Sequence, residues 1–246
     1  MILLRASLFN TIFYIYTAIT CVACIPFIFA PRNMILRIVR IYLNGLYTLE
    51  KHVINLDYEI RGLENLPKDG SFLIAAKHYS TYETLKLHLI FSDPAIILKK
   101  ELLSIPVWGK FLQRMDMIAI DRSNPVKSAK QIIAGAQHIA EQNRPLVIFP
   151  QGTRVKLTHT TQDKPYKNGI AHMQAATNMP IIPLALNTGK FWPRGKWMKY
   201  PGKAVFEFLS PLPSDISSKD MMEMLETRLE KQSQKLCDEA EEANKK

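Results

Sequence analysis

The 246-residue chain is poor in cysteine, and it lacks several patterns that mark common enzyme classes. Its three cysteines are too few for a disulfide framework. Cys21 and Cys24 fall within an apolar run, so we interpret them as small apolar residues of a protein in a reducing compartment. There is no Gly-x-Ser-x-Gly nucleophile elbow, Walker loop, dinucleotide-binding glycine pattern or His-Glu-x-x-His. We therefore expect no cofactor and no metal, and a hydrolase that uses a serine elbow is disfavoured.

Acidic residues are scarce in one part of the chain. The formal net charge is +10, but the segment Asp215–Lys246 has six basic and nine acidic residues, so the preceding 214 residues carry +13. Between Arg154 and Lys203, nine basic residues accompany a single acid, Asp163. A field of this sign attracts nucleic acids, anionic membranes or phosphorylated substrates. No nucleic-acid-binding signature accompanies it, so we expect no nucleic acid partner.

Charged residues are absent from Leu8 to Ala30, a run that is almost wholly apolar or weakly polar. At 23 residues it is long enough to cross a bilayer, which needs about 20. Arg5 precedes the run, whereas Arg32, Arg37 and Arg40 follow it. The heavier positive flank predicts that the C-terminal side, with the rest of the chain, faces the cytoplasm, at the inner membrane if the protein is bacterial.

A cleaved signal peptide is the competing interpretation of this run. The run is longer than the usual apolar region of such peptides, about 7–15 residues, and Pro31 directly follows Ala30, the only plausible cleavage residue. Pro26 leaves open a kinked or re-entrant segment instead of a clean span. We interpret the run as a membrane anchor.

The next segment, Met34–Leu49, has apolar residues at helical spacing. It predicts either an amphipathic helix on the membrane surface or a helix packed on the following domain. We accordingly divide the chain into residues 1–54, the anchor and this juxtamembrane helix, and residues 55–246, one α/β domain.

Beyond residue 55, short apolar runs alternate with helical patterns. Strands are expected at 58–61, 71–77, 95–98, 117–120, 146–149, 181–186 and 204–209, a turn at 66–70, and helices at 81–91, 105–113, 125–141, 168–177 and 217–243. Asn124 as N-cap and Pro125 in the first turn mark the start of one helix. This alternation is typical of a mostly parallel sheet flanked by helices, whose ligands bind beyond the carboxyl ends of the strands.

His78 stands at the carboxyl end of the expected strand 71–77, and Glu83 follows five residues later across the start of a helix. A carboxylate so placed can accept a hydrogen bond from one imidazole nitrogen, which leaves the other nitrogen as a base near neutral pH. The same spacing recurs in His52…Asp57 and His88…Asp93. Neither of those pairs follows a strand end, so we expect both to be coincidental.

A second candidate lies at Pro150–Arg154, where an apolar strand ends and Gly152 and Arg154 follow. A tight turn with free backbone donors and a guanidinium suits the binding of a phosphate group. Arg122, after another strand, would complete a two-arginine phosphate clamp. Either arginine could instead be a surface ion-pair partner.

Four stretches together resemble the motifs of the glycerolipid acyltransferases, in the same order. They are His78-Tyr-Ser-Thr-Tyr-Glu83, Ile118-Ala-Ile-Asp-Arg122-Ser-Asn124, Phe149-Pro-Gln-Gly-Thr-Arg154 and Ile182-Pro183-Leu-Ala. The match spans about residues 55–210 and is best to the 1-acyl-glycerol-3-phosphate (lysophosphatidic acid) acyltransferase family, in which an N-terminal membrane segment is common.

The resemblance implies a membrane-bound O-acyltransferase of phospholipid biosynthesis that forms phosphatidic acid. His78 would be the general base and Glu83 would orient it, while the hydroxyl of lysophosphatidic acid attacks the thioester of acyl-CoA or acyl-carrier protein without an acyl-enzyme. The implied substrate-binding residues are Arg122, Gln151, Gly152, Thr153 and Arg154, which would hold the acceptor, and Pro183, which would shape the acyl pocket or the core.

Two residues depart from the family pattern. Glu83 replaces the usual Asp and is one methylene longer, so His78 or the helix has to shift. Gln151 replaces the usual Glu and can donate as well as accept hydrogen bonds. Another acceptor, such as a lyso-ornithine lipid, therefore stays open, as does a non-catalytic protein that binds anionic lipids.

Tryptophans and lysines gather in the segment Thr188–Gly202. Aromatic and basic residues together suit a membrane interface, so this segment is a candidate element for contact with phospholipids. A solvated loop with partly buried tryptophans is the alternative.

Overall fold

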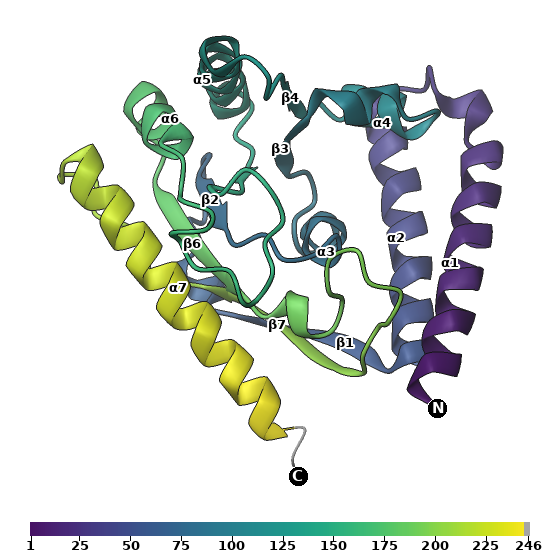
Figure 1. Ribbon diagram of the computed structural model, residues 1–246. Helices are drawn as coiled ribbons and strands as arrows, with labels where there is room; N and C mark the ends of the chain where they lie inside the picture. The colour runs from purple at the N-terminus through teal and green to yellow at the C-terminus, as the bar shows by residue number, and fades with distance from the viewer. Residues whose placement is uncertain (244–246) are drawn as a thin grey trace.

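The computed structural model describes residues 1–243, and within them the chain forms one seven-stranded sheet (Figure 1). The strand order is β1-β7-β6-β2-β5-β3-β4, and every neighbouring pair is parallel except β6 and β7. The predicted mostly parallel sheet is thus confirmed, with β2 at its centre. The strands are β1 Leu56–Arg61, β2 Leu73–Ala76, β3 Ala95–Lys99, β4 Ile118–Ile120, β5 Leu146–Ile148, β6 Ile181–Leu186 and β7 Gly202–Phe208.

Helices cover both faces of the sheet. One face carries α1 Ile2–Ala23, α2 Arg32–Ile54, α3 Tyr82–Ile90 and α4 Trp108–Arg114, and the other carries α5 Pro125–Glu141, α6 Gly169–Thr177 and α7 Ser218–Ala243 (Figure 1). Short 3-10 turns lie at Ile25–Phe27, Leu63–Asn65, Lys100–Ser104 and Thr188–Lys190.

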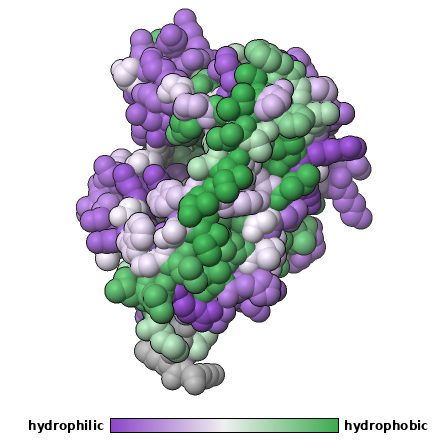
Figure 2. All heavy atoms as spheres, turned by 90° about the vertical axis from the view of Figure 1, so that its right-hand side faces the viewer, coloured by the Kyte–Doolittle hydropathy of each residue, from purple (hydrophilic) through white to green (hydrophobic). Residues whose placement is uncertain are grey.

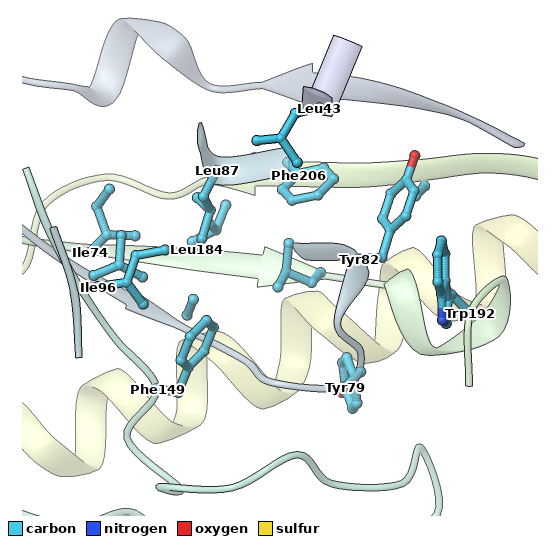
Figure 3. Close-up of a cluster of buried hydrophobic side chains, with 14 of the residues drawn as sticks. Leu43, Ile74, Tyr79, Tyr82, Leu87, Ile96, Phe149, Leu184, Trp192 and Phe206 are labelled. Carbon is cyan, nitrogen blue, oxygen red and sulfur yellow. The ribbon is translucent and has the colours of Figure 1, made fainter. Parts of the chain in front are cut away.

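The strands bury both of their faces, as expected for a parallel sheet between two helical layers. Along β2, Ile74 packs in the cluster under α2 and α3, while its neighbour Ala75 packs in the cluster under α5 to α7. Figure 3 shows the first cluster, where Ile74, Leu184 and Phe206 project from the sheet toward Leu87. This core holds the carboxyl end of β2 rigidly in the middle of the domain.

Most of the expected elements are present, with shifted ends. Asn124 caps α5, since its side chain accepts a hydrogen bond from the backbone N–H of Lys127 at 2.9 Å. The helix expected from Ile105 starts only at Trp108. Pro106 explains the delay, because a residue that precedes proline is disfavoured in the helical region, and Ile105 is extended with ψ 124°.

The apolar run Leu8–Ala30 is not one continuous helix, which agrees with the kinked or re-entrant alternative that Pro26 left open. Helix α1 begins at Ile2, contains Arg5 and ends at Ala23. The chain then turns back, and α2 lies beside α1 (Figure 1). Arg5 Nε donates to the carbonyl oxygen of Val53 at 2.6 Å, so the start of α1 lies at the end of α2.

Helix α2 packs on the sheet domain, which was one of the two predicted alternatives for this segment. Its residues Ile35, Tyr42 and Leu46 are buried in the same cluster as Ile74 of β2. Helix α2 ends at Ile54, at the predicted division of the chain, but residues 1–54 share this apolar cluster with the rest of the domain.

Helix α1 leaves much of its apolar surface uncovered. It is the one helix in the described part of the chain that is long and apolar enough to cross a membrane, by length and composition. Figure 2 shows a continuous hydrophobic band on the side of the molecule where α1 lies. The most exposed apolar side chains of α1 and the following turn include Leu4, Ile15, Ile19, Val22 and Phe29, at 54–76% exposure.

Candidate active site

His78 and Glu83 form a hydrogen-bonded pair just beyond the carboxyl end of β2. His78 Nδ1 lies 2.9 Å from Glu83 Oε1. The carboxylate is fully buried, whereas 16% of the His78 side chain is exposed. The imidazole stacks on the ring of Phe149, with centroids 3.9 Å apart. This arrangement fixes the ring plane and leaves Nε2 as the nitrogen that is free to meet a substrate.

The extra methylene of Glu83 is accommodated by the backbone that leads into α3. Glu83 Oε1 accepts hydrogen bonds from the N–H groups of Tyr79 at 2.7 Å and Ser80 at 2.6 Å. Ser80 Oγ in turn accepts from the N–H of Tyr82 at 3.1 Å. Ser80 and Glu83 thus bind free backbone N–H groups ahead of α3 in a way that resembles a capping box, although the N-cap itself is Thr81; our sequence analysis missed this Ser-x-x-Glu pattern. It places the carboxylate for His78 by folding the helix start around it.

Thr188 is a further member of this site that sequence analysis missed. It is fully buried, and its hydroxyl donates to Glu83 Oε2 at 2.8 Å. No local pattern links residues 105 positions apart, because only the sheet brings the segment after β6 beside β2. Both oxygens of Glu83 therefore have partners, as a buried carboxylate requires.

The variant Thr188→Val is expected to lower the free energy of unfolding by about 1–3 kcal/mol, because it leaves a buried carboxylate oxygen without a donor. It should also lower kcat, since Glu83 then holds His78 less firmly. Thr188→Ser is the matched control, because it keeps the hydroxyl. Urea unfolding and initial rates check this, and a valine variant as stable as the wild type would contradict the assigned role of Thr188.

Residues next to His78 are anchored to the long C-terminal helix α7. Lys77, only 1% exposed, pairs with Glu230 Oε1 at 2.5 Å. The same oxygen accepts a hydrogen bond from Tyr166 of the 151–168 loop at 2.9 Å. Helix α7 therefore ties the end of β2 to the loop that follows β5.

The other two histidine–acid pairs do not form sites. Asp57 is held by Tyr47 and Lys51, and His52 is exposed at the end of α2. Burial lowers the pKa of His88 to about 4, so this ring stays neutral. Asp93, five residues after His88, pairs with Arg32 and Arg144, so the spacing is coincidental as expected.

The predicted tight turn after β5 is present, but the N–H of Gly152 is used within the turn and is not a free donor for a ligand. The N–H of Gly152 donates to the carbonyl of Phe149 at 2.8 Å, and Gly152 has φ 68°, which favours glycine. A Cβ at this position would lie 3.2 Å from Lys167 Nζ, so the turn has an ammonium beside it. Thr153, the next residue, is half-buried.

Arg122 and Arg154 line two different cavities, so the structure does not show them as a single clamp. Arg122, Gly152 and Lys167 line a cavity of about 230 Å³, which we call the apolar cavity because isoleucines from β3, β4, β5 and α5 form its wall. Arg154 lines a second cavity of about 350 Å³ beside α1. Its guanidinium donates a hydrogen bond to Thr81 Oγ1 at 2.7 Å, and Thr81 follows His78 by three positions in the sequence.

Two predicted substrate-binding residues are buried in the structure. Gln151 is 4% exposed, and its amide donates to the carbonyl of Lys164 at 3.3 Å, a bond that glutamate could not donate. Pro183 is buried within β6, in register with Ala75. Its carbonyl accepts from the N–H of Leu209 at 2.9 Å, so Pro183 belongs to the core, which was the second of its two predicted places.

The arrangement can perform general base chemistry. A histidine oriented by a buried carboxylate can remove a proton from a hydroxyl group, and basic side chains on either side can hold anionic substrates. Within residues 1–243, no group of three or more His, Cys, Asp or Glu side chains could hold a metal ion.

Comparison with known proteins agrees with this geometry. The family model described as Acyltransferase matches residues 57–187. A 1-acyl-sn-glycerol-3-phosphate acyltransferase of Pseudomonas aeruginosa is 36% identical over 154 residues, which are 63% of this chain and 58% of that protein. One of Helicobacter pylori is 33% identical over 175 residues, 68% of this chain and 73% of that protein.

The fold has a solved counterpart. The crystal structure of the 1-acyl-sn-glycerophosphate (LPA) acyltransferase PlsC from Thermotoga maritima superposes with a TM-score of 0.77 over 96% of this chain and 98% of that chain. At 20% identity, this likeness concerns the fold alone. The chain spans only 58% of the Pseudomonas relative and 42% of a coconut relative of the same name. The family model covers more than half of the chain, including His78, Glu83, Arg122 and Arg154, and the chain belongs to the acyltransferase family.

Proposed function

We propose that this protein is a 1-acylglycerol-3-phosphate O-acyltransferase. It would move a fatty acyl group from acyl-CoA or acyl-carrier protein to the free hydroxyl of lysophosphatidic acid and so form phosphatidic acid. The observation that carries the proposal is the pair of His78 and Glu83, joined at 2.9 Å at the central strand end, where α/β folds bind ligands. The names of its relatives agree.

In the proposed step, His78 Nε2 removes the proton of the acceptor hydroxyl while the hydroxyl oxygen attacks the thioester carbonyl. A carbon–oxygen bond forms and the carbon–sulfur bond breaks. His78 then passes the proton that it took from the hydroxyl to the leaving thiolate. Glu83, hydrogen-bonded to Nδ1, stabilises the imidazolium that forms between these events. The step uses no cofactor and no covalent acyl-enzyme.

The acceptor's phosphate would bind on the side of the Gly152 turn. Arg122 and Lys167 bring two positive charges to the apolar cavity, and Gly152 keeps the turn open. Charge-assisted hydrogen bonds to a phosphate are among the strong ones in proteins. Phe149 connects this cavity to the site, since it lines the cavity and stacks on His78.

Membrane association would follow from the exposed apolar face of α1. A single span by α1 would carry its partner α2 along, because Arg5 and Val53 are hydrogen-bonded at the same end of the helix pair. Helix α2 has Arg37 and Arg40 exposed and buries its other face on the sheet domain. We therefore favour an anchor that does not cross the bilayer, in which α1 lies in the membrane interface with its apolar face toward lipid.

The test is a panel of acceptors with labelled acyl-CoA: lysophosphatidic acid, lyso-ornithine lipid and lysophosphatidylcholine. We expect lysophosphatidic acid to be preferred, because Arg122 and Lys167 match a phosphate monoester. If lyso-ornithine lipid is preferred, the proposed acyl transfer stands but lysophosphatidic acid is not the acceptor. No product from any lysolipid, with folded and membrane-bound protein, would leave a lipid-binding protein as the better account.

A further inference from the structure

The second cavity contains more positive charge than the proposed acceptor site needs. This basic cavity, of about 350 Å³, lies between α1 and the Thr188–Gly202 segment. Arg154, Arg194 and Lys196 line it together with Trp192 and Trp197, and no aspartate or glutamate is among its lining residues. Such a cavity suits an anion with several charges and an aromatic or apolar part.

The two arginines of the basic cavity are held next to each other without a carboxylate between them. Arg154 donates to Thr81 Oγ1 at 2.7 Å, and Arg194 donates to the backbone carbonyl of Arg154. Within residues 1–243, none of the three side chains Arg154, Arg194 and Lys196 forms a salt bridge. Adjacent like charges repel, so an anion that bridges them lowers the electrostatic energy.

The wall of the basic cavity is built by buried contacts. Lys199 is 5% exposed, its Nζ donates to the carbonyls of Lys196 at 2.8 Å and Trp197 at 3.2 Å, and it lies 5.1 Å from the ring centroid of Trp192. The wall is fastened to α1 where Trp197 Nε1 donates to Ser7 Oγ at 3.0 Å. The segment that carries Arg194 and Lys196 is therefore fixed in place before any ligand arrives.

We propose that the basic cavity binds the phosphate groups of the acyl donor, those that coenzyme A carries beyond its pantetheine arm. This rests on the proposed acyl transfer. In lysophosphatidic acid the phosphate is close to the reacting hydroxyl, whereas in acyl-CoA the long pantetheine arm separates the phosphates from the thioester. Arg154 is held at Thr81, three residues from His78, so it stands next to the reacting groups and the donor's phosphates would bind at Arg194 and Lys196 of the same cavity.

An aromatic surface accompanies these charges. The indole of Trp197 is part of the cavity lining and 51% exposed although it is fastened at Nε1. A rigid exposed indole is a stacking surface for a nucleobase. The adenine of coenzyme A could stack on this indole, whereas inorganic phosphate and a lipid headgroup have no ring that could do so.

The first test is calorimetric titration of coenzyme A into the full chain in phosphatidylcholine nanodiscs. The double variant Arg194→Gln/Lys196→Gln should bind coenzyme A at least about tenfold more weakly, because it loses two charge-assisted contacts. Lys219→Gln, which removes one exposed charge at the start of α7, is the control and should bind like the wild type. An unchanged Kd in the double variant would overturn the proposal, whether or not the protein is active.

The second test compares two donors in kinetics. With acyl-CoA, the double variant should lose at least about tenfold in kcat/KM, whereas with an acyl-N-acetylcysteamine thioester, which has no phosphate, it should match the wild type. A raised KM for lysophosphatidic acid with both donors would assign the cavity to the acceptor instead. Weaker binding to anionic vesicles with unchanged donor kinetics would assign it to membrane lipid. A wild type without transfer from either donor would overturn the proposed function, and the titration would still decide the cavity's ligand.

Discussion

Replacing His78 with alanine is expected to lower kcat for acyl transfer by about 10²–10⁴-fold, the usual contribution of a general base. The imidazole is the group at this strand end that Glu83 orients, with its other nitrogen left for the substrate. Glu83 keeps its bonds to Tyr79, Ser80 and Thr188 in the variant, so the fold should survive. Initial rates with lysophosphatidic acid, together with thermal unfolding, check this result.

The matched control is His52→Ala. His52 also has an acid five residues later, but it is exposed at the end of α2 and Asp57 is engaged by Tyr47 and Lys51. This variant should keep the wild-type rate. An unchanged rate in His78→Ala would show that His78 is not the general base, and no transfer by either protein would favour a protein that binds anionic lipids without catalysis.

Replacing Lys86 with methionine is expected to lower the free energy of unfolding by about 3–5 kcal/mol at pH 8, because it leaves a buried carboxylate uncompensated. Lys86 of α3 pairs with Glu50 of α2, and both side chains are at most 1% exposed. The ammonium also lies 4.7 and 4.8 Å from the ring centroids of Tyr47 and Tyr82. The pair thus joins the N-terminal helices to the helix that carries Glu83. Urea unfolding of the purified variant measures the loss.

The loss should shrink in acid. Burial raises the pKa of Glu50 to about 7, even though Lys86 lowers it, and without Lys86 it rises further. A carboxyl whose pKa is higher folded than unfolded stabilises the fold at low pH, and this contribution is lost as the pH rises through the folded-state pKa. Lys86→Met should therefore be less destabilising at pH 5.5 than at pH 8. The double variant Glu50→Gln/Lys86→Met should recover most of the loss at pH 8, and a loss independent of pH would contradict this explanation.

Patterns that depend on local sequence predicted the fold well. The alternation of strands and helices gave the layered sheet, and Asn124 with Pro125 marked the start of α5. The length of the apolar run did not give the N-terminal architecture. The turn after Ala23 and the hydrogen bond from Arg5 to Val53 join residues that are far apart in sequence. A window of hydropathy contains no information about such a contact.

One part of the candidate site could likewise be predicted from local sequence, and the other part required the structure. His78 and Glu83 are five residues apart at a strand end, so their pairing could be predicted. Thr188 could not be found, because its bond to Glu83 depends on how β6 lies beside β2. The separation of Arg122 and Arg154 into two cavities also required the structure, since both residues simply follow strands in the sequence.

The most direct test of the account follows the acyl group itself. Purified protein is mixed with acyl-CoA labelled in its acyl chain and with lysophosphatidic acid in mixed micelles, and the label is located after denaturation. We predict that it appears in phosphatidic acid, with one free thiol released for each product and none of the label on the protein. Label that remains in the thioester, appears as free fatty acid or is attached to the protein would contradict direct transfer assisted by His78.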